Sequence, residues 1–306
     1  MEKDTDKLVR KEADEIYESA QDWINQNMKY FDLTINRASA SDELQFKAFI
    51  ELLFMADMFY PATLFHKKLI QKIIDLAIHV SHNVSFAKYF LNDPSLVSGG
   101  QEMIIFKENY KVKDIFDDKD RFKSMVGAGI DLLARRTPYR LLDSSYSMHK
   151  AGVKTMSESD ETYYKMTVLP NKRFNYLYLS DSSAYSITHT LFYITDMGRK
   201  HPSYLDYNRI TLILRSMIIF YACKGNMDIL GECLLDLAFI NADELLNMRQ
   251  DPLVLACFEL IRKAQNNSGY VYSPRHLDDS KMTDEDVFFE NYHTSMVSLG
   301  AAYAFR

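Results

Sequence analysis

The stretch DKLVRKEADEIYESAQDWINQNMKYF, residues Asp6–Phe31, shows the pattern that decides the fold. Its apolar side chains recur every three or four positions, which is the period of an α-helix with one buried face. The apolar positions are Leu8, Ala13, Ile16, Tyr17, Ala20, Trp23, Ile24 and Met28. We therefore predict a long amphipathic helix at this end of the chain.

Similar segments fill most of the remaining sequence, and many begin at polar capping residues or end at glycine or proline. The chain has only 10 Gly and 7 Pro, too few for the many turns of a β-sandwich, a β-barrel or a Rossmann sheet. We expect an all-α protein of about twelve helices in antiparallel hairpins, closed into an (α/α)6 toroid, with an open α-solenoid as the alternative. The aromatic alternation of residues 171–180 is also compatible with a short strand.

Composition narrows the possible partners and location. No low-complexity linker divides residues 1–306, so we expect a single domain. The net charge of −6 provides no basic footprint for nucleic acid. No apolar run reaches the roughly 18 residues of a membrane span, and the charged N-terminus has no apolar signal-peptide core. Three cysteines in apolar surroundings indicate reduced thiols, so we expect a cytoplasmic protein with no membrane association.

The stretch AYSITHTLFYITDMG, residues Ala184–Gly198, predicts a helix with two different faces. One face is aliphatic, and the opposite one carries a stripe in which three residues lie within about 40° of His189. These are Tyr185, Tyr193 and Asp196, and Thr188 lies on the flank of the stripe. Unpaired buried polar groups cost about 1–3 kcal/mol each, so this face is typical of a cavity wall. A purely structural histidine is the alternative interpretation.

Asp196 occupies an electrostatically unfavourable place near the C-terminal end of this helix, where the helix dipole disfavours a carboxylate. The sequence leaves three possible reasons for an acid there. It could partner His189, it could pair with Arg199, or it could cap the next turn.

A second stretch, ENYHTSMVSLGAAYAF, predicts that His293 lies near the start of the final helix. Glu290 precedes it by three residues, a spacing that lets the two side chains hydrogen-bond. Tyr292 and the small residues that follow indicate a tightly packed wall. We therefore expect the two histidine-bearing helices to face the same cavity.

The candidate catalytic residues are His189, Asp196 and His293, and the same three are the candidate metal ligands. Two histidines and one carboxylate form a common set for a divalent ion. Without a metal, Asp196 or Glu290 would orient a histidine for proton transfer near neutral pH. The candidate ligand-binding residues are Tyr185, Thr188, Tyr193, Glu290 and Tyr292.

The C-terminal segment SGYVYSPRH…ENYHTSMVSLGAAYAF resembles the final hairpin of the protein prenyltransferase β-subunits, over residues 266–305. The resemblance implies an (α/α)6 toroid in which the histidine of the Y-H-T motif, here His293, is a zinc ligand. That family supplies its other zinc ligands from an Asp-x-Cys pair, and this chain has none. The resemblance therefore implies the fold but not a complete zinc site.

A second resemblance rests on two motifs, T-H-x-x-F-Y-x-T-D-x-G at Thr188–Gly198 and Y-H-T at Tyr292–Thr294. They are similar to motifs of uncharacterised bacterial helical proteins associated with peptide and natural-product biosynthesis. We therefore expect a toroid enzyme that modifies a small molecule or peptide in a central cavity, by His/Asp acid–base or metal-assisted chemistry. A non-catalytic scaffold that binds a peptide or a partner is the alternative.

Overall fold

The computed structural model describes residues 2–86, 89, 93, 96–115, 119–130, 133, 136–153, 158–171, 179–275 and 279–306. In these residues it contains thirteen α-helices and a few short 3₁₀ turns, and no strand. One isolated bridge pairs Gln265 with Val271. The predicted all-α class is confirmed, whereas the possible strand in 171–180 falls mainly on residues outside the described part.

The chain packs as two compact units. Unit 1 consists of Met1–Met28 and Asn171–Arg306, and unit 2 consists of Lys29–Pro170. Each unit contains only helices and turns among its described residues. The single domain over residues 1–306 and the closed toroid stay predictions.

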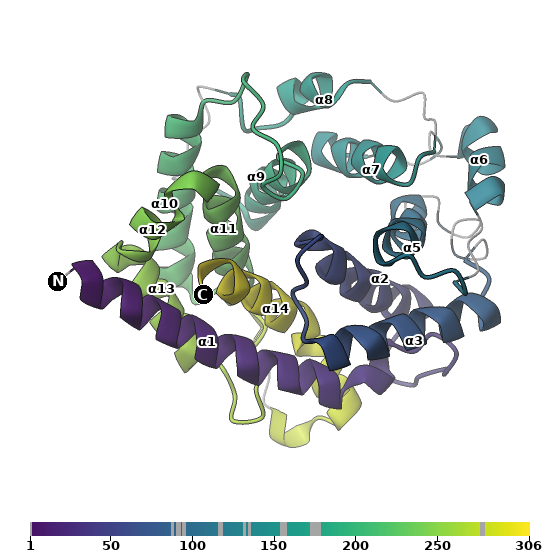
Figure 1. Ribbon diagram of the computed structural model, residues 1–306, viewed down its shortest axis with the longest axis horizontal. Coiled ribbons are helices and arrows are strands. Elements are labelled where there is room, and N and C mark those ends of the chain that lie inside the picture. Colours follow the sequence, from purple (N-terminus) through teal and green to yellow (C-terminus); the bar gives the residue numbers. More distant parts are fainter. Residues whose placement is uncertain are drawn as a thin grey trace. The chain divides into compact units, whose positions relative to one another are not determined.

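Unit 2 is built around α5. This helix packs against α2 on one side and α7 on the other, while α3 contacts α2 and α8 contacts α7 (Figure 1). The helices of this unit are α2 Asp42–Met58, α3 Lys67–Asn83, α5 Val97–Tyr110, α6 Lys119–Gly127, α7 Pro138–Lys150 and α8 Asp160–Met166.

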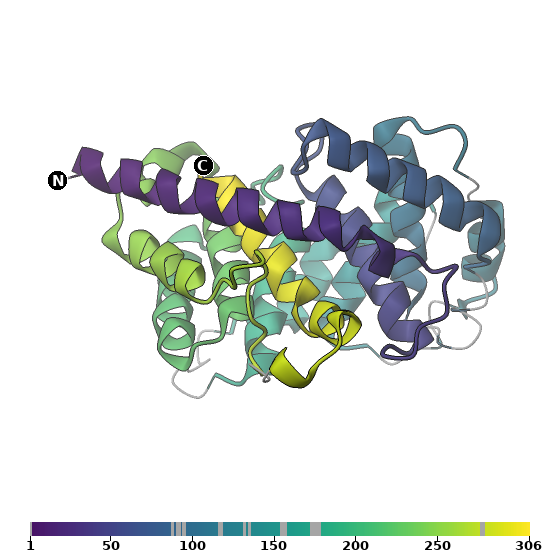
Figure 2. The same cartoon turned by 90° about the horizontal axis from the view of Figure 1, so that it is seen from below.

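Unit 1 joins the two ends of the chain. The first helix packs across the last one, and the last one also packs against α11 (Figures 1 and 2). The helices of this unit are α1 Glu2–Gln26, α9 Asp181–Ile194, α10 Tyr207–Lys224, α11 Met227–Ile240, α12 Leu245–Arg249, α13 Pro252–Lys263 and α14 Asp284–Phe305. The predicted N-terminal amphipathic helix is therefore present as α1.

The central helix of unit 1 is α11, because α9, α10, α13 and α14 all pack on it. Every one of its residues is buried, as expected for a helix that is apolar on nearly all sides. The Asn226 side chain caps its start by accepting a hydrogen bond from the Ile229 amide at 3.1 Å. The few acidic side chains of α11 are therefore inside the unit.

Gly231 allows α14 to cross α11 closely. A Cβ atom at this position would lie 2.8 Å from Cγ1 of Val297, which is closer than two carbon atoms can pack. Only glycine therefore permits this crossing as it stands. The crossing places the middle of α14, from His293 to Val297, beside the first turns of α11.

No helix in the described part of the chain combines the length and the apolar character needed to cross a bilayer.

Candidate metal centre

Two carboxylates on α11 form the base of the candidate site. Asp228 lies in the first turn, where the helix dipole favours a negative charge, and Glu232 follows one turn later on the same face. Their residues are only 3% and 1% exposed. Buried carboxylates require hydrogen bonds or a cation around them, because burial without either is very costly.

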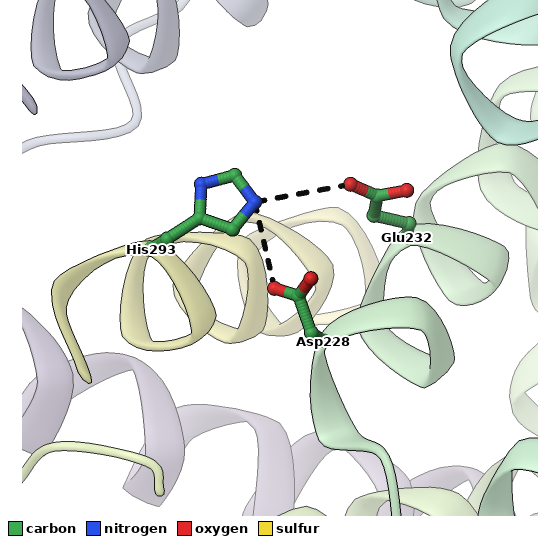
Figure 3. A group of neighbouring side chains, drawn as sticks. All are labelled: Asp228, Glu232 and His293. Atoms are coloured by element: carbon green, nitrogen blue, oxygen red, sulfur yellow. Dashed lines mark ion pairs between the residues drawn. The ribbon is translucent and has the colours of Figure 1, made fainter. Parts of the chain in front are cut away.

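His293 reaches these carboxylates from α14, as Figure 3 shows. Its Nε2 atom lies 3.5 Å from Oδ1 of Asp228 and 4.0 Å from Oε1 of Glu232. Each of the three residues offers one ligand atom, and these atoms all lie within 4.8 Å of one another. Thr294 adds a hydrogen bond of 3.4 Å from its hydroxyl to Oδ1 of Asp228.

Helix α9 supplies a hydroxyl to each carboxylate. The Tyr185 hydroxyl donates to Oδ2 of Asp228 and the Thr188 hydroxyl donates to Oε2 of Glu232, both at 2.6 Å. Burial, followed by the neighbouring Asp228 carboxylate, raises the pKa of Tyr185 far above its usual range. The phenol therefore stays protonated and remains a hydrogen-bond donor.

His189 lies on the α9 side of Glu232. Its Nδ1 atom is 3.6 Å from Oε2 of Glu232, and its ring packs edge-on against Tyr185 at a centroid distance of 5.8 Å. The side chains of His189 and His293 are 17% and 31% exposed, whereas those of the carboxylates are 5% exposed or less. The site is therefore closed at its carboxylate base and open on its histidine side.

These separations suit a metal ion. Two ligand atoms that each lie about 2.1 Å from one ion are about 3 Å apart at a right angle and about 4.2 Å apart on opposite sides of it. The distances of 3.5 and 4.0 Å from His293 Nε2 to the two carboxylate oxygens fall within this range. One imidazole and two carboxylates also form a donor set that divalent transition metals accept.

The structure brings together four of the residues that the sequence singled out: Tyr185, Thr188, His189 and His293. The first three lie on α9, as predicted, and they meet His293 through the carboxylates of α11. Thr188 was predicted to touch a ligand, but its hydroxyl is directed at Glu232. The catalytic roles proposed for the two histidines stay predictions.

Asp196 lies elsewhere and is not a member of the group of possible metal ligands. It follows the last residue of α9 in a left-handed turn, with φ of 49°, and its carboxylate pairs with Arg199 at 3.1 Å. Met197 and Gly198 continue this turn at φ of 53° and 81°. Of the three explanations for an acid at this helix end, the structure supports the pairing with Arg199.

The other predicted ligand-binding residues have neighbours within the protein, and their predicted roles toward a ligand stay predictions. Glu290 does not bond His293, because its carboxylate accepts from the Ser273 hydroxyl at 2.6 Å and faces Arg275 at 3.7 Å. Tyr292 is buried and its ring stacks on Phe288 at 5.5 Å. Tyr193 is also buried, with its ring centroid 6.4 Å from that of His189.

Sequence reasoning missed Asp228 and Glu232. A signal was present, because the otherwise apolar segment NMDILGECLLDLAFI carries acids at Asp228, Glu232 and Asp236, each four residues after the last. This spacing puts the three acids on one side of a helix whose other residues are almost all apolar. Acids at a helical spacing inside an apolar helix indicate a buried polar site.

The comparisons with known proteins identify a family and no relative of established activity. No curated protein and no solved structure matches the chain. The family model described as a domain of unknown function (DUF6895) matches residues 17–303, which is nearly the whole sequence. The chain therefore belongs to the DUF6895 family.

Proposed function

We propose that unit 1 binds one divalent transition-metal ion through Asp228, Glu232 and His293 and uses it to modify a small molecule or peptide. The observation that supports this proposal is the convergence of the three ligand atoms from α11 and α14. It differs from the metal site expected from the sequence, because the two carboxylates of α11 take the places of His189 and Asp196 as ligands.

The donor set favours Zn²⁺, Mn²⁺ or Fe²⁺ over ions that prefer oxygen ligands alone, because one ligand is an imidazole. Three protein ligands leave coordination positions open, as catalytic metal sites require and closed structural sites do not. A metal in such a site polarises a substrate carbonyl or activates a bound water.

The opening on the histidine side is where a substrate would approach. The partly exposed rings of His189 and His293 border this opening, and the buried carboxylates lie beneath them. In this proposal His189 keeps the role predicted from the sequence, which is to transfer a proton to or from the substrate. Cys223, Cys233 and Cys257 all carry free thiols, which supports the further proposal of a reducing, cytoplasmic setting.

Metal analysis of the purified full-length protein tests the proposal. We expect one ion per chain, either as isolated or after titration with Zn²⁺, Mn²⁺ or anaerobic Fe²⁺ followed by calorimetry. The substitutions Glu232→Gln and His293→Ala should each abolish binding at micromolar ion concentrations, because each removes one of only three protein ligands.

His201→Ala is the matched control, because it removes an exposed histidine that lies on the loop after α9. It should bind the ion as the wild type does. The metal proposal is contradicted if none of the three ions binds stoichiometrically, or if His293→Ala binds as tightly as the control.

A further inference from the structure

We propose that Tyr185 and Thr188 are positioning residues which hold the two carboxylates so that the centre accepts one metal ion and not two. This inference rests on the proposed metal site and adds a role for helix α9, which contributes no ligand to it. The structural basis is that the two oxygens of each carboxylate have different neighbours.

In both carboxylates, one oxygen faces His293 and the other faces α9. The inner oxygens are Oδ1 of Asp228 and Oε1 of Glu232, which lie 3.5 and 4.0 Å from Nε2 of His293. The outer oxygens are Oδ2 and Oε2, and each accepts a hydrogen bond of 2.6 Å from a hydroxyl group of α9. The same helix therefore fixes the orientation of both proposed carboxylate ligands.

The Thr188 proton has a preferred acceptor. The Thr188 hydroxyl lies 2.6 Å from Oε2 of Glu232, whereas the Ala184 carbonyl, Nδ1 of His189 and the Tyr185 carbonyl are 3.3, 3.3 and 3.4 Å away. A hydroxyl has a single proton, and a hydrogen bond to an ionised acceptor is the shorter and stronger one. The Thr188 hydroxyl therefore donates to the carboxylate.

The spacing on α9 explains how one helix reaches both carboxylates. Tyr185 and Thr188 are three residues apart and lie on one face of α9, and Asp228 and Glu232 are four apart on α11. Residues at these spacings lie about one helical turn from each other, so the two pairs match. The longer tyrosine side chain reaches Asp228, and the shorter threonine side chain reaches Glu232.

The hydrogen bonds to the outer oxygens also limit the number of ions that the site can hold. Two-metal centres place their ions roughly 3.5–4 Å apart. In the usual two-oxygen bridging mode, a carboxylate binds one ion through each of its oxygens. In this site a second ion would have to displace the hydroxyls of Tyr185 and Thr188 from Oδ2 and Oε2. The arrangement therefore favours a single ion on the His293 side.

The test uses the full-length protein, chelator competition with Zn²⁺, and the visible absorption spectrum of the Co²⁺-loaded form. We expect Thr188→Val and Tyr185→Phe each to weaken Zn²⁺ binding by about 10–100-fold, the usual effect of losing a group that orients a metal ligand. Both should change the Co²⁺ spectrum, since the ligand geometry changes. Thr188→Ser keeps the hydroxyl and should restore affinity and spectrum.

Thr190→Val is the matched control. It makes the same substitution at another buried position of α9, where the hydroxyl donates to the Ser186 carbonyl and not to a carboxylate. Its Zn²⁺ affinity and Co²⁺ spectrum should equal those of the wild type. A loss of stability alone would affect Thr188→Val and Thr190→Val alike.

The possible failures can be told apart. If the wild type binds no ion, the proposed metal site and this inference both fall. If the wild type binds one ion and Thr188→Val and Tyr185→Phe bind it as tightly, only the positioning role is overturned. Two ions per wild-type chain would overturn the claim that the outer oxygens are reserved for α9.

Discussion

At the scale of single residues, buried acids take different states according to what surrounds them. Asp228 and Glu232 accept hydrogen bonds from hydroxyl groups and face imidazoles. Glu102 on α5 of unit 2 is also buried, but the charge that acts on it comes from another buried acid, Asp57 on α2. Two neighbouring buried carboxyl groups cannot both be ionised at low cost, so one of them keeps a proton.

Glu102→Gln should change how the stability of unit 2 depends on pH. Burial, followed by the Asp57 carboxylate, raises the pKa of Glu102 well above its ordinary 4.5; Asp143 adds to this and Lys150 opposes it. Because the pKa is higher in the folded state, the contribution of Glu102 to the unfolding free energy is fully present below pH 4.5. It declines as the pH rises toward the folded-state pKa, by at most about 1.4 kcal/mol per pH unit. Glutamine has a similar size and cannot ionise, so the variant should lose this decline.

Urea unfolding at pH 5 and at pH 8 measures the effect. The difference in unfolding free energy between the two pH values should be smaller in Glu102→Gln than in the wild type. Glu108→Gln, at an exposed position of the same helix, should behave as the wild type. Equal pH dependence in all three proteins would show that Glu102 is ionised in the folded state.

At the scale of helices, the crossing of α11 and α14 determines the geometry of the candidate site. The metal ligands come from both helices, so their separation sets the distances from His293 to Asp228 and Glu232. At Gly231, Val297 of α14 occupies the space that a side chain would need. A substitution at this glycine should therefore change the distances between the proposed metal ligands.

We expect Gly231→Ala to lower the unfolding free energy by about 1–3 kcal/mol, the usual effect of adding a methyl group to a well-packed core. It should also weaken Zn²⁺ binding, because α14 must move away from α11. Adding Val297→Ala removes the methyl group that the new side chain would meet, so the double variant should regain much of the binding. Chelator competition and urea unfolding check both effects, and full additivity of the two substitutions would argue against this contact.

At the scale of the whole molecule, unit 1 depends on both ends of the chain. Arg306 pairs with Asp14 at 3.0 Å and with Glu18 at 3.6 Å, which ties the C-terminus to α1. Trp23 of α1 packs between Tyr270 and Phe288, with ring centroids at 5.4 and 5.6 Å. Unit 1 therefore includes α1, although residues 29–170, which separate α1 from the rest of unit 1 in the sequence, belong to the other unit.

Gly269→Ala should disrupt the docking of α1. A Cβ atom at Gly269 would lie 2.2 Å from the Ser19 carbonyl oxygen, and its φ of +105° strains any other residue. We expect a loss of at least about 2 kcal/mol from strain and overpacking together. The chain has one tryptophan, Trp23, so its fluorescence during urea unfolding reports on this region.

Gly127→Ala is the control for this substitution. A Cβ atom there meets nothing within 4 Å, and alanine suits a helix better than glycine. It should leave stability unchanged or raise it slightly. If Gly269→Ala unfolds at the same urea concentration as the wild type, the turn at this residue does not hold α1 in place.

The sequence alone predicted the all-α class, the helix that became α1, and two helices that bear site histidines, α9 and α14. Hydrophobic periodicity and capping residues are local signals, so they locate helices and their polar faces without knowledge of the rest of the chain. The same signals placed Tyr185, Thr188 and His189 on one side of α9, where the structure has them.

Only the tertiary structure decided which polar groups meet. The sequence grouped Asp196 with His189 because both fall on one predicted helical stripe, but α9 ends at Ile194 and the left-handed turn that follows directs the carboxylate to Arg199. Asp228 and Glu232 were missed because periodicity says nothing about neighbouring helices. Their role depends on α11 lying between α9 and α14, and that placement follows from the packing of all the helices of unit 1 together, including the close crossing that Gly231 permits.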